Sequence, residues 1–158
     1  MYLLDDLDQA GAGALRDLLE LLEQPPGAVA LIIRSCGGAL GIAFALRSAL
    51  RLLAKAGWET VCIGIGEVSS AALDVFMEGR TRYLTKESYC VVHGCRMDMS
   101  GDGAPTIHSW GRFLEETNRE MLRRLKRATG RDWQEALRGD VIIGAEEAVR
   151  CGIAHKIV

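Results

Sequence analysis

Adjacent serines stand where one apolar stretch of the chain ends and another begins. In the segment GEVSSAALD, Ser69 and Ser70 follow ETVCIGIG and precede AALDVFM. Gly37 and Gly38 break a second apolar stretch in SCGGA, and His93 closes a third in YCVVH. A serine hydroxyl, an imidazole and the backbone N–H groups of a glycine turn can serve as nucleophile, general base and oxyanion donors. Together they form the minimum set for acyl transfer.

Each of these residues also has a plain structural explanation. A serine ahead of an apolar helix is most often an N-cap, and we favour this explanation for Ser69. Gly37 and Gly38 are compatible with a tight turn alone. A single histidine on an apolar strand, such as His93, is more often a hydrogen-bonded structural residue than a catalyst. Chemistry is therefore favoured only if the fold brings these residues together.

The elements that must position them alternate between strands and helices. Continuous aliphatic runs at 28–34 and 59–66 are typical of parallel strands covered on both faces, and YCVVH predicts a third strand. Largely apolar helices are predicted at 39–57 and 69–79, and a short amphipathic helix at 12–24. This alternation predicts right-handed βαβ units, with the helices on one side of a mostly parallel sheet. The predicted fold class is α/β.

A parallel sheet brings its strand-to-helix turns to one edge. The turn at Gly37 and Gly38 and the turn at Ser70 should therefore lie close together, with His93 at the same edge. Both turns lead into helix N-termini, whose unpaired N–H groups and partial positive charge favour an oxyanion or a phosphate. We expect a site for acyl transfer at this edge.

Composition limits the classes to which the chain can belong. Its 158 residues, of which 49% are hydrophobic and 25% charged, predict one domain, 1–158, with a substantial core. A net charge of −2 argues against a nucleic-acid partner. Apolar runs stop well short of the roughly 18 residues that cross a membrane, and the first residues lack the features of a secretion signal. We therefore expect a cytoplasmic protein without membrane contact, whose five cysteines remain thiols.

Four segments resemble the Clp protease proteolytic subunit family, serine peptidases with the ClpP/crotonase fold. LIIRSCGGALGIAFAL is similar to the family's strand, S-P-G-G turn and helix, and GEVSSAALDVFMEG to its G-x-A-S-M-G nucleophile turn. YCVVHG is similar to the M-I-H-Q strand, and GDVIIGAEEAVRCGIAHKIV resembles the family's C-terminal stretch almost position for position. The resemblance covers nearly the whole chain. It implies repeated β-β-α and βαβ units with a projecting handle helix.

The resemblance also implies a role for individual residues. Ser70 would be the nucleophile, His93 the general base and Asp140 the carboxylate that orients the imidazole. The backbone N–H groups of Gly38 and Ala71 would form the oxyanion hole. Neither a metal nor a cofactor is implied.

Departures from the family pattern leave these catalytic side chains in place. Gly37 matches the glycine that lets the chain approach the substrate, but Cys36 replaces the family's proline before it. Ala71 replaces the methionine after the nucleophile. Gly139 stands where the family has an arginine that helps to link ring assembly to the order of the active site.

Assembly and partners follow from the same resemblance. Residues 94–128 match the handle, a strand and a long helix that join two rings face to face, so we expect a homo-oligomer of stacked rings that acts on peptides or unfolded proteins. An unfoldase ATPase of the AAA+ class is a possible partner. The chain begins at the family's first core strand, and the segment that helps to engage that ATPase is expected to be missing.

Polar side chains line one side of two of the predicted helices, and on the first of them this side is expected to face solvent. On the helix at 39–57 these are Arg47, Arg51 and Lys55. The segment 111–130 predicts a second amphipathic helix, whose apolar side consists of Leu114, Met121, Leu122, Leu125 and Ala128, and whose polar side consists of Glu115, Arg119, Glu120 and Arg124.

Three other functions stay open from the sequence. A crotonase-type acyl-CoA hydratase or isomerase would use backbone N–H groups with carboxylates, and Glu67 is the acidic residue at the serine turn. A non-catalytic or regulatory subunit of a peptidase assembly is the second. The third is metal or redox chemistry at Cys90, His93 and Cys95, although Cys90 and His93 point to opposite faces of a strand.

Overall fold

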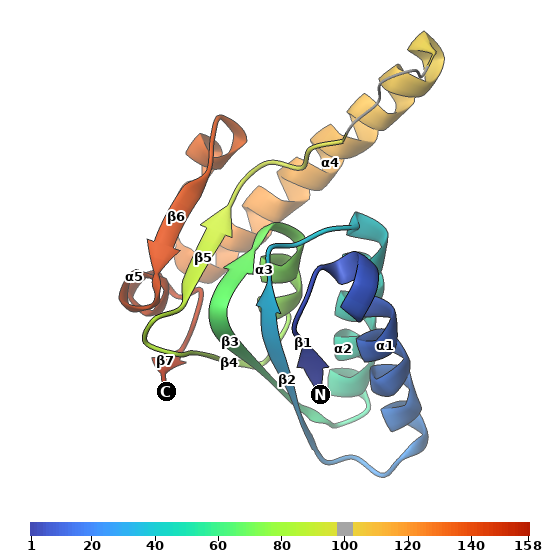
Figure 1. Cartoon of the computed structure of the whole chain (residues 1–158), viewed down its shortest axis with the longest axis vertical. Helices are drawn as coiled ribbons and strands as arrows, with labels where there is room; N and C mark the ends of the chain where they lie inside the picture. Colours follow the sequence, from blue (N-terminus) through green and yellow to red (C-terminus); the bar gives the residue numbers. More distant parts are fainter. Residues whose placement is uncertain (98–102) are drawn as a thin grey trace.

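Strands of a seven-stranded sheet form the centre of the molecule (Figure 1). The computed structural model describes residues 1–97 and 103–158. The strands run in the order β1-β2-β3-β4-β7, while β5 pairs with β3 and with β6. All neighbouring strands are parallel except β5 and β6, so the predicted α/β class with a mostly parallel sheet is confirmed. The strands are β1 (Tyr2–Leu3), β2 (Ala28–Ser35), β3 (Glu59–Ser69), β4 (Thr81–Leu84), β5 (Tyr89–Val92), β6 (Val141–Gly144) and β7 (Lys156–Ile157).

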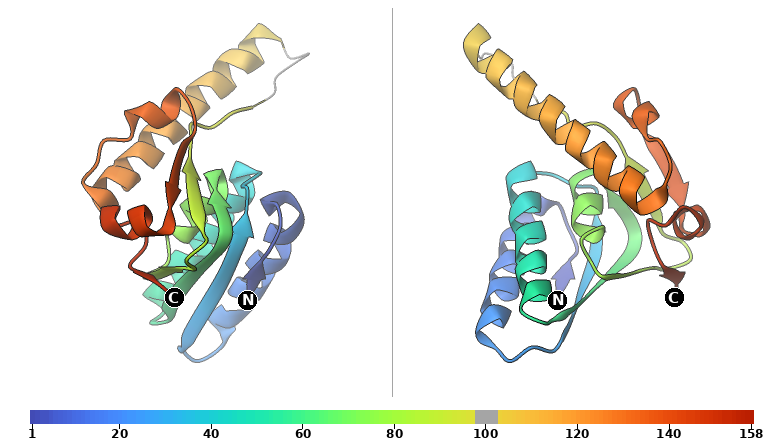
Figure 2. Two further views of the ribbon diagram at one scale, coloured as in Figure 1. Left: turned by 60° about the vertical axis from the view of Figure 1, so that its left-hand side comes forward. Right: turned by 180° about the vertical axis from the view of Figure 1, so that it is seen from behind.

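Helices α1, α2 and α3 and the C-terminal half of α4 cover one face of this sheet (Figure 2). The α2 helix packs with residues at helical spacing, Ala43, Leu46, Leu50 and Leu53, all of which are buried. The buried side chains of β2 and β3 meet this layer and alternate with exposed or partly exposed ones. Only one face of these strands is covered, so the expectation of strands covered on both faces was wrong. The helices are α1 (Leu7–Glu20), α2 (Leu40–Lys55), α3 (Ser70–Phe76), α4 (Ala104–Thr129) and α5 (Ala145–Cys151), with 3-10 turns at Leu21–Glu23 and Gln134–Leu137.

The central strand β3 changes its partner halfway along its length. Its first half pairs with β4, from Val61 to Gly64, and its last residues, from Glu67 to Ser69, pair with β5. This second pairing explains why β3 continues three residues beyond the predicted strand. Strand β4 was not predicted, because its four residues, TRYL, show no clear alternation of apolar and polar side chains.

Two arginines on the polar sides of their helices, Arg47 and Arg124, are largely buried. Arg47 is only 8% exposed, and the side chain of Arg124 is 13% exposed. The expectation that Arg47 faces solvent was wrong, because both guanidinium groups turn toward carboxylates of α3 and of the residues that follow it. Periodicity along one helix does not reveal charges that a second helix supplies.

Helix α4 is 26 residues long and its N-terminal half extends past the sheet (Figures 1 and 2). This outer half exposes large apolar side chains, among them Ile107, Trp110 and Phe113. The handle at 94–128 stays a prediction: α4 projects as a handle helix would, no strand forms at 94–97, and residues 98–102 lie outside the described part of the chain. No helix of the described residues is both long enough and apolar enough to cross a membrane.

Candidate active site

Ser70 stands at a sharp junction where β3 passes directly into α3. Its backbone φ is 54°, in the left-handed region, and it is the only non-glycine among the described residues with a positive φ. A side chain in this region is strained, and such strain is concentrated at functional sites. A strained serine between a strand and a helix is also the geometry that exposes a nucleophile at the edge of a sheet.

The glycine turn after β2 lies directly against this serine. Strands β2 and β3 are parallel and Ser35 pairs with Val68, so both turns leave the same edge of the sheet. Gly37 has a φ of +114°, and a Cβ added there would lie 2.7 Å from the Cβ of Ser70. The predicted convergence of the two turns is therefore present, and only glycine fits at position 37 without moving Ser70.

Within this turn, the backbone N–H of Gly38 has no hydrogen-bond acceptor in the described part of the chain. The N–H of Gly37 donates to Ser35 Oγ at 3.1 Å, and the N–H of Ala39 donates to Asp8 Oδ1 at 2.7 Å. Ala71 is the second residue of α3, so its own N–H has no acceptor within the helix. Both amides predicted for the oxyanion hole are thus available to a ligand.

A small cavity of about 90 Å³ collects most of the predicted site residues. Four of them line it: Ser70, His93, Gly38 and Ala71. The other lining residues, which the sequence analysis did not assign to the site, are Leu40, Asp74, Cys95, Arg96 and Met121. Asp74 follows Ser70 by one helical turn, a spacing that could have suggested it, whereas no local pattern identifies Arg96.

His93 has its ring held by a backbone carbonyl. Its Nδ1 lies 2.7 Å from the carbonyl oxygen of Gly94. A carbonyl can only accept, so Nδ1 must donate and must carry the proton in the neutral ring. This leaves Nε2 as a proton acceptor, which is the tautomer that a general base for a serine hydroxyl requires.

Asp140 stands directly before β6, and His93 stands directly after β5. The carboxylate of Asp140 nevertheless pairs with a residue other than His93. The antiparallel register ends with Val92 paired to Val141, and one further step would set His93 opposite Asp140, although neither residue belongs to a strand. Asp140 Oδ1 nevertheless accepts a hydrogen bond from Arg96 Nη2 at 2.7 Å, and among the described residues Asp140 is not part of the cavity lining. The structure therefore brings Ser70 and His93 to one cavity and leaves the Asp140 carboxylate paired with Arg96.

Ser69 does not cap the helix that follows it. It occupies the N-cap position of α3, but its side chain makes no capping hydrogen bond, and this part of the prediction was wrong. Its Oγ is buried and has no hydrogen-bond partner within the described chain. The reason is that β3 extends through Ser69, which turns its side chain into the core.

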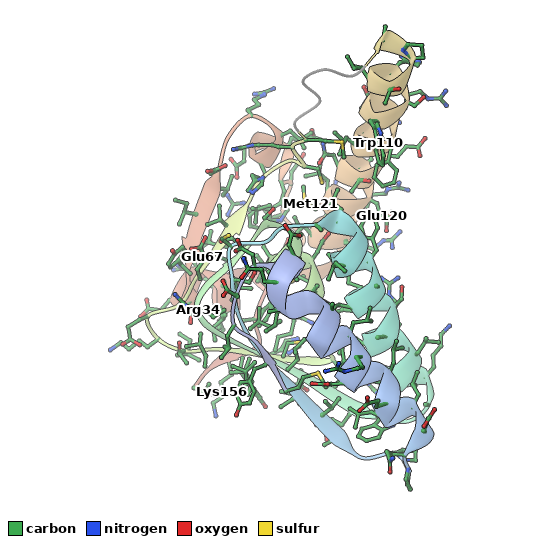
Figure 3. The ribbon with its side chains drawn as sticks, turned by 45° about the vertical axis from the view of Figure 1, so that its right-hand side comes forward. Arg34, Glu67, Trp110, Glu120, Met121 and Lys156 are labelled. Carbon is green, nitrogen blue, oxygen red and sulfur yellow. The ribbon has the colours of Figure 1, made fainter. Side chains whose placement is uncertain are left out.

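Glu67 lies outside the cavity of Ser70. It accepts a hydrogen bond from the Tyr89 hydroxyl at 3.0 Å and lines a separate hollow with Arg34 (Figure 3). A crotonase-type reaction would need a carboxylate beside the oxyanion donors, and Glu67 is not placed to supply it.

The cysteines on either side of His93 are poor candidates for thiolate chemistry. Burial raises the pKa of Cys90 to about 12 and that of Cys95 to about 11. Both therefore remain protonated near neutral pH, whereas metal ligands and redox-active cysteines react as thiolates.

Comparisons with known proteins identify the family from the sequence and the fold from the structure. A family model described as Clp protease matches residues 1–158. Among solved structures, the chain is similar to the N165D mutant of ClpP1 from Listeria monocytogenes, with a TM-score of 0.82 and 17% sequence identity, covering 100% of this chain and 90% of that one. No curated protein matches the sequence.

Proposed function

Because the chain belongs to the Clp protease family, we propose that it is a serine endopeptidase with Ser70, His93 and Asp140 as its triad. The observation that carries this proposal is the left-handed Ser70 on the same cavity as His93 and the partner-free N–H of Gly38. The substrate would be a short peptide or an unfolded protein chain.

The reaction follows from the positions of these groups. His93 Nε2 takes the hydroxyl proton as Ser70 Oγ attacks the peptide carbonyl, and the N–H groups of Gly38 and Ala71 bind the oxyanion that forms. His93 then gives the proton to the leaving amine, and a water molecule, activated in the same way, hydrolyses the acyl-enzyme. Asp140 would stabilise the imidazolium at each stage.

In this mechanism, Asp140 must turn from Arg96 to His93. Both side chains of the Arg96–Asp140 pair are well exposed, at 69% and 49%. Exposed pairs contribute only about 0.2–1 kcal/mol, so the carboxylate can change partners at small cost.

We therefore predict that Arg96→Gln will retain or raise peptide hydrolysis. The free energy of unfolding, measured in urea, should change by less than about 1 kcal/mol, because only an exposed pair is lost. Hydrolysis of a fluorogenic peptide by the variant and by the wild type provides the comparison. A large drop in kcat, with the fold intact, would mean that Arg96 itself takes part in the reaction.

The proposal includes assembly into stacked rings through α4. Its outer half exposes Ile107, Trp110 and Phe113, which a monomer would leave in water. We place this assembly in the cytoplasm, with its active sites facing the interior. An unfoldase ATPase is the proposed partner, because it would deliver unfolded chains to these sites.

A non-catalytic or regulatory subunit is the second candidate. The pairing of Asp140 with Arg96 is the observation that favours it, because this pairing leaves the triad incomplete. The two candidates differ in whether the isolated protein hydrolyses peptides.

Peptide hydrolysis measured across separated oligomers tests the proposal. The protein is fractionated by size, the mass of each fraction is determined by native mass spectrometry, and each fraction is assayed with a fluorogenic peptide. We expect activity in a multimeric fraction and little in the monomer. Multimers without activity would support the regulatory candidate, and an exclusively monomeric protein would contradict the assembly.

A further inference from the structure

Five charged side chains, four from three helices and one from the residues after α3, meet on the side of α3 that faces away from the sheet core. Asp74 belongs to α3, and Glu78 follows its end. Arg47 and Arg51 come from α2, and Arg124 comes from α4. Four of these side chains are between 10% and 16% exposed, Arg51 being the exception at 51%. We call these five residues the α3 ion cluster.

Arg124 is the member of the cluster that joins α4 to α3. Its Nη1 donates to Asp74 Oδ1 at 2.9 Å, and its Nη2 donates to the backbone carbonyl of Asp74 at 3.2 Å. The same Nη2 lies 3.3 Å from Glu78 Oε2. The guanidinium thus holds both the side chain and the main chain of α3, a geometry that the fork of an arginine allows and a lysine does not.

Charge and burial make these contacts mutually dependent. Burial alone would raise the pKa of Glu78, but the hydrogen bond from Arg51 and the charges of Arg124, Arg51 and Arg47 lower it below its ordinary value. Burial lowers the pKa of Arg124, and the charge of Asp74 opposes that change. Removing one member of the cluster would leave an oppositely charged, largely buried side chain without an ion-pair partner.

The cluster is one helical turn away from the nucleophile. Helix α3 has only seven residues, Ser70 begins it, and Asp74 stands four positions later. Asp74 also lines the cavity that contains Ser70 and His93. The opposite side of α3 packs into the core through Ala72, Val75 and Phe76, so the α3 ion cluster fixes the side that the core does not hold.

We propose that Arg124 is a positioning residue, which sets the location of Ser70 from α4 by holding α3 through Asp74. The expected effect on the reactivity of Ser70 rests on the proposed function. The expected effect on the stability of α3 does not. Neighbouring positions along α4 support the assignment. Figure 3 labels Glu120 and Met121 where α4 passes the start of α2, and Met121 lines the same cavity as Asp74.

Covalent labelling of Ser70 by a fluorophosphonate probe tests the kinetic part. For Arg124→Gln, we expect the maximal labelling rate constant to fall by about tenfold or more, with the probe concentration for half-maximal rate nearly unchanged. The labelling rate of Arg124→Lys should fall less, because the lysine keeps the positive charge and one donor nitrogen. Asp74→Asn combined with Arg124→Gln should be no slower than Arg124→Gln alone, since the Asp74–Arg124 ion pair is already lost in Arg124→Gln.

Arg123→Gln is the matched control. Its side chain is 62% exposed, and among the described residues it contacts Glu120 and the backbone carbonyl of Arg119, both on the same helix, so its labelling rate should equal that of the wild type. All rates are compared well below the melting temperature of each variant. A lower melting temperature for Arg124→Gln with an unchanged maximal rate would reduce Arg124 to a structural role and overturn the proposal.

Hydrogen exchange separates this inference from the proposed function. The backbone amides of α3 should exchange faster in Arg124→Gln than in Arg123→Gln, whether or not Ser70 reacts with the probe. Unchanged exchange in α3 would contradict the positioning role. If wild-type Ser70 is not labelled, the proposed function fails, and the exchange result alone decides whether Arg124 holds α3.

Discussion

Ser70→Ala is expected to lower kcat for peptide hydrolysis by on the order of 10⁴-fold, leaving only the contributions of the oxyanion hole and of binding. The physical reason is the loss of the only hydroxyl among the described residues that stands at a left-handed turn on the cavity of His93. The measurement is kcat and KM for a fluorogenic peptide. KM should change little, since the hydroxyl contributes mainly to the transition state.

Ser69→Ala is the control for this prediction. The Ser69 hydroxyl is buried and has no partner among the described residues, so its removal should leave kcat unchanged. The free energy of unfolding should stay the same or rise slightly, because an unsatisfied buried polar group is removed. If Ser69→Ala abolishes activity while Ser70→Ala retains it, the nucleophile has been assigned to the wrong serine.

Gly37→Ala is expected to produce the second largest loss. The new Cβ would lie 2.7 Å from Ser70 Cβ and 3.2 Å from the carbonyl oxygen of Ser69, and the backbone φ of +114° disfavours any side chain. We expect kcat to fall about 100-fold, which is the scale for a displacement of about 1 Å at a reacting group. The free energy of unfolding should fall by about 1–3 kcal/mol.

Gly41→Ala, on α2 four residues after Gly37, provides the comparison. A Cβ at Gly41 would meet nothing within 4 Å, and its φ is not in the left-handed region. Alanine favours a helix over glycine by about 1 kcal/mol, so stability should be equal or higher and kcat unchanged. Equal activity of Gly37→Ala and Gly41→Ala would show that the glycine turn does not position Ser70.

The sequence was sufficient to predict the edge of the sheet at which the site lies. The aliphatic runs before Gly37 and before Ser70 identify two parallel strands, and parallel strands bring their following turns together. The clash of a Cβ at Gly37 with Ser70 confirms this convergence. The position of the site could be predicted because it depends on the local apolar pattern and on the order of strands and helices, and a single sequence contains both.

Side-chain pairing was not predictable in the same way. Arg47 and Arg124 lie on the polar stripes of their own helices, and nothing in that periodicity reveals that carboxylates of Asp74 and Glu78 will meet them. The contact of Asp140 with Arg96 likewise joins residues on different segments. These pairings depend on how elements pack in three dimensions, which the pattern along one element does not encode.

The most direct test of the central claim is the site of covalent modification in the wild-type protein. The protein is treated with a fluorophosphonate, digested and analysed by tandem mass spectrometry, with a heat-unfolded sample as the control. We predict a single adduct on Ser70, formed only in the folded protein. An adduct on another residue, or none in any oligomeric form, would contradict a nucleophilic role for Ser70.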